Sequence, residues 1–352
     1  MHPHTITKYH GIEFLRFAMA LVVILYHLSA WINPLKSSLL AGVITYWQPL
    51  AVPVFWCLSG FIFYSVYGNR IQSLHVNFRD FALARFTRLY PLALVTLLVC
   101  LALNEIYFRA HQSSFVYHRG DLYHFLLNML LASHWGLQKV TAFNGPVWSV
   151  SVEVITYFIF FIVARFFGKS PVVAILVILL GKAIAHIEPN LTDHLAISSC
   201  IQLFFWGGVV SSIYSRLEKL MDSNFTAVLL VLSAFLCFVS LLLPERYSTQ
   251  LLPPGLVLWS QMAFRNAKGW VTKITDLSGS LTYSSYLLHF PVILLAVMVL
   301  DKLQISRSFL VGHSGLVIIM TITLVLSRLT FVYFEVPMQS LLRSRMSRRR
   351  SS

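Results

Sequence analysis

Long apolar segments recur along this chain of 352 residues and limit its fold more than any other feature. Three of them read PLALVTLLVCLALNEIYF, SVEVITYFIFFIVARFF and FTAVLLVLSAFLCFVSLLL. Each approaches or reaches the roughly 20 residues that a helix needs to cross the ~30 Å hydrocarbon core of a bilayer. None shows the alternation of polar and apolar residues that a membrane β-barrel requires. We therefore predict an all-α polytopic membrane protein.

Composition supports this class, because 57% of the residues are hydrophobic, only 11% are charged and the mean hydropathy is +0.72. These values exclude a water-soluble globular protein. The first apolar segment is too long for a cleaved signal peptide and carries Glu13 and Arg16, so we expect a retained helix. We predict about ten transmembrane helices in one bundle, over residues 12–32, 46–67, 88–108, 147–167, 171–187, 197–215, 225–243, 251–264, 281–300 and 314–334.

The net charge of +14 is distributed unevenly along these segments. With a cytoplasmic N-terminus, most arginines and lysines fall in inner loops and in the tail RSRMSRRR. The positive-inside rule expects this asymmetry when both termini are cytoplasmic. We assign the basic residues to orientation and to contact with anionic lipid rather than to nucleic acid. The chain then divides into one transmembrane domain, residues 1–340, and a basic cytoplasmic tail, residues 341–352.

The first expected helix, GIEFLRFAMALVVILYHLSAWI, carries ionisable residues that are costly to expose to lipid. Arg16 and His27 are eleven residues apart, which places them about 20° apart around the helix and ~16 Å apart along it. Glu13 lies on the same face, so this polar stripe should face the bundle interior or a water-filled cavity. The residues alone also allow a simpler arrangement, in which Glu13 pairs with Arg16 and His27 bonds to a neighbouring helix.

The segment NGPVWSVSVEVITYF begins another expected helix near Pro146. Ser149 and Glu153 are four residues apart on one face of this helix, and Trp148 stands beside them at the membrane interface. We expect Glu153 at the depth of His27, where a carboxylate and an imidazole form a possible general-base pair. A carboxylate in a first turn also has a simpler role, which is to stabilise the helix dipole.

Three further segments carry polar residues that need a reason. In RDFALARFTRLYP, Arg85 and Arg88 share a helix face that suits an anion such as a phosphate group, although membrane anchoring explains them equally well. In LTYSSYLLHFPV, His289 precedes the kinking Pro291, and we favour packing or substrate contact over chemistry for it. In FEVP, Glu335 closes the last span and is expected to meet a basic residue at the inner surface.

The longest outer segment, residues 109–146, contains the apolar stretch DLYHFLLNMLLASHW. It is too short to cross the membrane, so we expect an interfacial or re-entrant helix there. We expect no metal site and no disulfide framework, because the cysteines lack paired spacing and nothing fixes the geometry of the N-terminal histidines. The residues concerned are Cys57, Cys100, Cys200, Cys237, His2, His4 and His10.

Five stretches, in this order along the chain, resemble the membrane acyltransferase-3 family of integral membrane O-acyltransferases. They are EFLRFAMALVVILYH, VPVFWCLSGFIF, RFTRLYP, WSVSVE and SLTYSSYLLHFPV, with FEVP as a weaker sixth. Together they cover nearly the whole chain. The resemblance implies a ten-helix protein of the bacterial cytoplasmic (inner) membrane. It also implies transfer of an acyl group, usually acetyl, from a coenzyme A thioester to a hydroxyl of an envelope carbohydrate such as O-antigen or exopolysaccharide.

The same resemblance implies roles for individual residues. Arg16, Arg85 and Arg88 match motifs that we assign to the acyl donor, and His27 and Glu153 match motifs that we assign to catalysis. We assign substrate binding or structural support to Trp148, Ser149, His289 and Glu13. The family usually has aspartate at the position of Glu13, and a Gly–Leu–Arg run in place of FLR, so this chain departs from the pattern there.

The implied partners are acetyl-CoA as co-substrate, a carbohydrate or glycolipid acceptor, and the lipid bilayer; we expect no permanently bound cofactor. Direct transfer to the sugar and an acyl-histidine intermediate both fit the residues. A transporter is the competing class, in which the polar stripe lines a path for a glycan, a lipid or a proton. It lacks the internal repeats of many transporters, and it does not explain the arginine motif and WSVSVE together.

Overall fold

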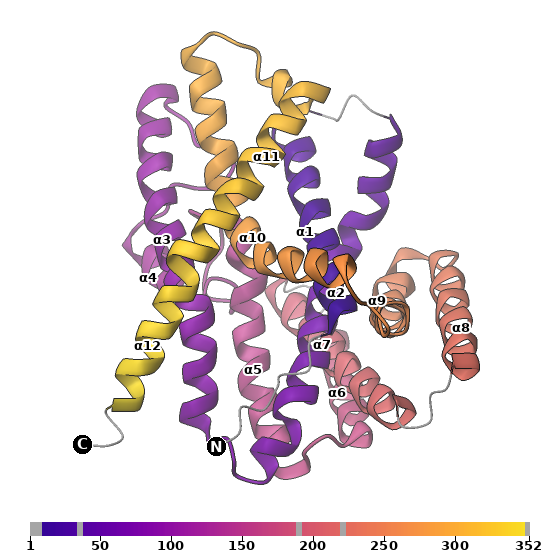
Figure 1. The fold of residues 1–352 in the computed structure, drawn as a ribbon. Helices are drawn as coiled ribbons and strands as arrows, with labels where there is room; N and C mark the ends of the chain where they lie inside the picture. Colours follow the sequence, from indigo (N-terminus) through magenta and orange to yellow (C-terminus); the bar gives the residue numbers. More distant parts are fainter. Residues whose placement is uncertain (1–8, 34–37, 188–191, 219–222, 349–352) are drawn as a thin grey trace.

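The computed structural model describes residues 9–33, 38–187, 192–218 and 223–348. These residues form an all-α bundle, with one isolated β-bridge between His118 and Ala142 in place of any strand. Figure 1 shows the arrangement of the helices, which are α1 (His10–Trp31), α2 (Ser38–Gln72), α3 (Phe78–His111), α4 (Leu122–Met129), α5 (Trp148–Phe167), α6 (Pro171–Ile187), α7 (Thr192–Leu217), α8 (Ser223–Leu241), α9 (Glu245–Ala263), α10 (Trp270–Lys302), α11 (His313–Thr330) and α12 (Val336–Arg348).

Eight helical segments of the described chain are long and apolar enough to cross a membrane, and they coincide with eight of the ten predicted spans. The fold is therefore that of an all-α polytopic membrane protein. The other two predictions differ in length and polarity. Helix α6 is an apolar helix shorter than the eight, and the predicted span 251–264 ends one residue beyond α9, whose first half carries charged and polar residues and whose middle carries Pro253 and Pro254.

Several helices extend well beyond the predicted spans. Helix α3 begins at Phe78, ten residues before the expected start at residue 88. At this observed start the Asn77 side chain accepts a hydrogen bond from the Asp80 backbone N–H at 2.9 Å. An asparagine at this position satisfies a backbone donor that the helix leaves unpaired. Because of this extension, Arg85 and Arg88 lie within a helix rather than in a loop before it.

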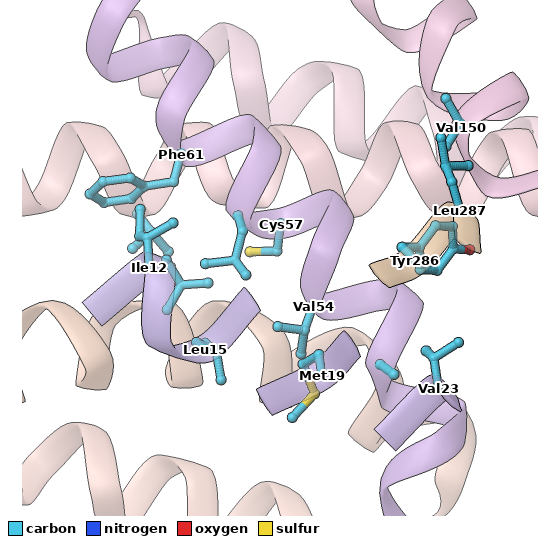
Figure 2. Close-up of a cluster of buried hydrophobic side chains, with 14 of the residues drawn as sticks. Ile12, Leu15, Met19, Val23, Val54, Cys57, Phe61, Val150, Tyr286 and Leu287 are labelled. Atoms are coloured by element: carbon cyan, nitrogen blue, oxygen red, sulfur yellow. The ribbon is translucent and has the colours of Figure 1, made fainter. Parts of the chain in front are cut away.

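Helix α1 occupies the centre of the bundle and packs against α2, α9 and α10. Its apolar face, Ile12, Leu15, Met19 and Val23, lies against side chains of α2 (Figure 2). The spacing of three and four residues places these side chains on one stripe of the helix. Arg16 and His27 lie four residues after Ile12 and Val23, so the polar stripe of α1 borders this apolar face instead of lying opposite it.

The segment between α3 and α5 folds back into the bundle. Its helix α4 is shorter than the predicted 121–135 and is followed by Leu131, whose φ of 54° is incompatible with continuation of the helix. Beyond it, the Trp135 indole N–H donates to the Ser151 carbonyl at 2.9 Å, and the Ser151 hydroxyl accepts from the His134 backbone N–H at 3.0 Å. These bonds attach the segment to the first turns of α5, which favours the re-entrant alternative over the interfacial one.

Helices α11 and α12 are continuous except for a π-helical turn, Phe331–Glu335, between them. In Figure 1 they cross the front of α3 as one long diagonal, and α12 packs against α3. Residues 341–348, predicted as part of a separate tail, are thus helical, while residues 349–352 lie outside the described part of the chain.

Close contact between α2 and α7 depends on glycine, and this gives a first prediction. A Cβ atom at Gly60 would lie 1.7 Å from the Phe204 carbonyl oxygen, so Gly60→Ala must separate the two helices. We expect a loss of at least about 1–3 kcal/mol of stability, measured as a lower Tm in detergent. Gly42→Ala is the matched control in the same helix, because a Cβ atom at Gly42 would meet no neighbouring atom within 4 Å. This variant should leave Tm unchanged or raise it. Equal Tm values for the two variants would contradict this account of the crossing.

Candidate functional site

A cavity of about 390 Å³ lies where α1, α2, α3, α5, α10 and α12 meet. Its charged lining residues are Glu13, Arg16, Arg85, Arg88, Glu153 and Arg343. Four arginines against two glutamates give the cavity a net positive charge. A concave site with this charge favours an anionic ligand.

Several polar atoms on the cavity wall are buried and have no hydrogen-bond partner within the described chain. They are Nε of Arg16, Nε of Arg85, Oε1 of Glu153 and Nε2 of Gln339. More than nine in ten buried polar groups in native proteins are paired, and an unpaired one costs about 1–3 kcal/mol. Four of them line one cavity, where water or a polar ligand is able to supply their partners.

Aromatic side chains contact the two arginines of α3 that line the cavity. Arg85 donates from Nη2 to the Tyr67 hydroxyl at 2.8 Å, and its guanidinium lies 4.9 Å from the centre of the Phe63 ring. The Arg88 guanidinium lies 5.9 Å from the centre of the Tyr283 ring. Contacts with ring faces stabilise a cation without neutralising it. Both positive charges therefore remain available to a ligand.

Glu335 lies on the π-helical turn between α11 and α12, within electrostatic range of Arg88. It is buried, its Oε1 accepts a hydrogen bond from the Ser284 hydroxyl, and its carboxylate interacts electrostatically with Arg88. The sequence predicted a basic partner for Glu335 at the inner surface, whereas this carboxylate is buried and interacts electrostatically with Arg88 without a direct ion pair among the described residues. The π-turn re-aims this side chain inward, a use of such turns that is common at functional sites.

Glu13, whose role the sequence leaves open, lies against α10. A Cβ atom at Gly279 would be 2.0 Å from Oε2 of Glu13, so the carboxylate occupies space that the missing side chain provides. Of the simpler arrangement, the ion pair between Glu13 and Arg16 is not formed among the described residues, whereas the hydrogen bond from His27 to a neighbouring helix is formed, with His289 of α10. Nε of Arg16 is left without a partner.

His27 belongs to a chain of hydrogen bonds rather than to a carboxylate pair. Its Nδ1 lies 2.8 Å from Nε2 of His289, and Nδ1 of His289 lies 2.7 Å from the carbonyl oxygen of Tyr286. A carbonyl only accepts, so Nδ1 of His289 carries a proton and donates it. The unprotonated Nε2 of a neutral His289 then accepts from Nδ1–H of His27. This assignment leaves Nε2 of His27 unprotonated and able to take up a proton.

Helix α10 makes this arrangement possible through Pro291. A proline inside a helix cannot donate to the carbonyl four residues earlier, here that of Leu287. The Asn144 side-chain amide donates to this carbonyl at 3.0 Å, so the opened turn is stabilised from the start of α5. The carbonyl that accepts from His289 lies in the same turn.

The structure corrects the predicted partner of His27. His289, expected to serve packing or substrate contact, is the residue that orients it. Glu153 instead hydrogen-bonds Ser59 and Tyr157 and interacts electrostatically with Arg16 and Arg85. Similar depth in the membrane does not fix the direction in which a side chain points, and for this reason the sequence argument paired the wrong residues.

Tyr286 connects the cavity to the histidine pair. Its hydroxyl donates to the Pro146 carbonyl at 2.8 Å and accepts from the Ser149 hydroxyl at 2.7 Å, and Ser149 lines the cavity. Its backbone carbonyl accepts from His289. Trp148 is directed elsewhere, edge to face with Trp56 at 5.9 Å between ring centres, so it supports the packing of α5 on α2.

Trp31 is a site residue that the sequence argument missed. Its indole is parallel to the His27 ring within 9°, with ring centres 4.1 Å apart, and parallel to His289 within 7°. It therefore covers one face of the histidine pair. Its spacing of four residues from His27 on α1 was a signal for this contact.

The residues 9–332 match the acyltransferase-3 family model, which is described as an acyltransferase domain. No curated protein and no solved structure gives a significant match. The fold and the match together define an integral membrane acyltransferase. The chain belongs to the acyltransferase-3 family, as its motifs predicted.

The charge of the cavity gives a second prediction, which concerns binding alone. Inorganic pyrophosphate should raise the Tm of the detergent-solubilised protein, because an anion that binds only the folded state stabilises it by about 2.7 kcal/mol at 100 times its Kd. Arg85→Ala combined with Arg88→Ala should abolish the shift. Arg79→Ala should retain it, because Arg79 is exposed on α3 and does not line the cavity. A shift that survives the double substitution would place the anion elsewhere.

Proposed function

We propose that this membrane acyltransferase moves an acetyl group from acetyl-CoA to a hydroxyl of an envelope carbohydrate. The observation that carries the proposal is the state of His27: one ring nitrogen is bonded to His289, the other makes no hydrogen bond among the described residues, and the same helix carries Arg16 into a cationic cavity. A positioned imidazole with a free nitrogen is suited to take a proton from an attacking hydroxyl. A cationic cavity is suited to hold a donor that carries phosphates.

Arg16, Arg85 and Arg88 bind the phosphate groups of the donor in this proposal. The pantetheine arm then extends along α1 from the cavity toward His27. Arg16 and His27 are eleven residues apart in one helix, which corresponds to ~16 Å of axial rise. An extended pantetheine arm is of comparable length, so phosphates at the arginines place the thioester near the imidazole.

The transfer itself is a nucleophilic substitution at the thioester carbonyl. The sugar oxygen attacks this carbon while its proton passes to Nε2 of His27, and the hydrogen bond from Nδ1 to His289 stabilises the orientation of the imidazolium. The C–S bond then breaks, and the coenzyme A thiolate takes the proton from His27. An acyl-histidine route uses the same nitrogen as nucleophile, with the sugar attacking in a second step.

We place the protein in the bacterial inner membrane with both termini in the cytoplasm. The support is the distribution of arginine and lysine along the chain, together with the family's usual task. Acetyl-CoA then reaches the cavity from the cytoplasm, and the carbohydrate approaches from the outer side. The transporter alternative has no further support, since the chain belongs to a family of acyltransferases.

Purified protein should transfer labelled acetyl from acetyl-CoA to an envelope glycan, and His27→Ala tests the mechanism. We expect kcat to fall by about 10²–10⁴-fold, because the variant lacks the general base. Its stabilisation by pyrophosphate should be unchanged, which separates loss of chemistry from loss of folding. A His27→Ala variant that acetylates at the wild-type rate would exclude the proposed mechanism.

Substitution of His289 tests its orienting role. His289→Leu removes the acceptor for Nδ1–H of His27, so kcat should fall by roughly 10–100-fold with little change in the KM for acetyl-CoA. His289→Gln is the matched variant, because its amide oxygen is able to accept the same proton. We expect it to retain clearly more activity than His289→Leu. If leucine and glutamine reduce kcat equally, acceptance of the hydrogen bond is not what His289 contributes.

A further inference from the structure

Helix α12 contributes to the cavity although it lies beyond the segment that defines the family. The family match ends at residue 332, whereas α12 covers Val336–Arg348. Two of its side chains, Gln339 and Arg343, line the cavity. They are four residues apart and therefore share one face of the helix. The same helix packs against α3, which carries Arg85 and Arg88.

The two side chains offer hydrogen-bond donors at different levels of the cavity. Nε2 of Gln339 is buried and unpaired within the described chain, so a donor is directed at a space that a ligand would occupy. Arg343 is exposed, which places its charge at the rim. An amide donor inside and a guanidinium at the entrance both favour a phosphorylated ligand that extends out of the cavity.

We propose that Gln339 and Arg343 bind the nucleotide end of the acyl donor, with Arg343 on its 3′-phosphate. This assignment rests on the proposed function and extends it to the far end of the substrate. If the arginines of α1 and α3 hold the pyrophosphate and the thioester lies toward His27, the adenosine 3′-phosphate is the last part to enter. The rim of the cavity is where the structure provides the additional cation.

The test compares acetyl-CoA with acetyl-dephospho-CoA, which differs only by the 3′-phosphate. Arg343→Ala should raise the KM for acetyl-CoA roughly tenfold, as expected for loss of a hydrogen bond to a charged group, and leave kcat unchanged. The same substitution should have no effect on the KM for acetyl-dephospho-CoA. Gln339→Met, which keeps the side-chain length and removes the donor, should raise the KM for acetyl-CoA several-fold.

Arg79→Ala is the control for loss of a positive charge outside the cavity. Arg79 is exposed on α3, and its substitution should leave the KM for both donors unchanged. An Arg343→Ala effect of equal size on both donors, or no effect on either, would overturn the assignment to the 3′-phosphate. If the wild-type protein uses neither donor, the proposed function fails together with this inference. Normal wild-type turnover with unaffected Arg343→Ala kinetics overturns only the inference.

Discussion

The cavity of this bundle is lined by four arginines and only two glutamates, and the rest of the site is organised around that constraint. Uncompensated charge is expensive at membrane depth. The fold reduces the cost by placing the Arg85 and Arg88 guanidinium groups over aromatic rings and by directing the buried Glu335 toward Arg88. The compensation is incomplete, and the remaining positive charge is what makes the cavity a site for an anion rather than a packed core.

A second constraint separates the arginine-lined cavity from the histidine pair. The arginines face a polar cavity, whereas His27 and His289 are bonded to each other and covered by Trp31. Tyr286 belongs to both regions, because its hydroxyl is bonded to Ser149 at the cavity and its carbonyl to His289. One residue of α10 thus fixes the relative position of the two regions. Three hydrogen bonds connect Ser149 to the His27 imidazole: Ser149 to Tyr286, Tyr286 to His289, and His289 to His27.

The sequence predicted the class of fold well, because membrane thickness imposes a length on every spanning helix and the apolar composition shows that length directly. The resemblance to the acyltransferase-3 family also assigned Arg16, Arg85 and Arg88 to one site, and these three side chains line one cavity. The sequence prediction paired His27 with the wrong residue, because the position of His289 depends on a local feature of α10. Pro291 leaves the Leu287 carbonyl without its helical donor, and the Asn144 side chain donates to it instead. Helical spacing within α1 carries no information about which residue of a neighbouring helix bonds to His27.

The same limit explains why the C-terminal helix was predicted as a basic tail. Its arginines satisfy the positive-inside rule whether or not they contact other helices. Composition therefore does not distinguish a basic tail at the membrane surface from a helix that lines the cavity. Only the packing of α12 across α3 shows that Arg343 faces the cavity. Helix α12 follows every other helix that lines the cavity in the order of the chain. The cavity therefore obtains its full lining only after α1, α2, α3, α5 and α10 have been synthesised, and a chain that has not yet reached α12 lacks one side of the cavity.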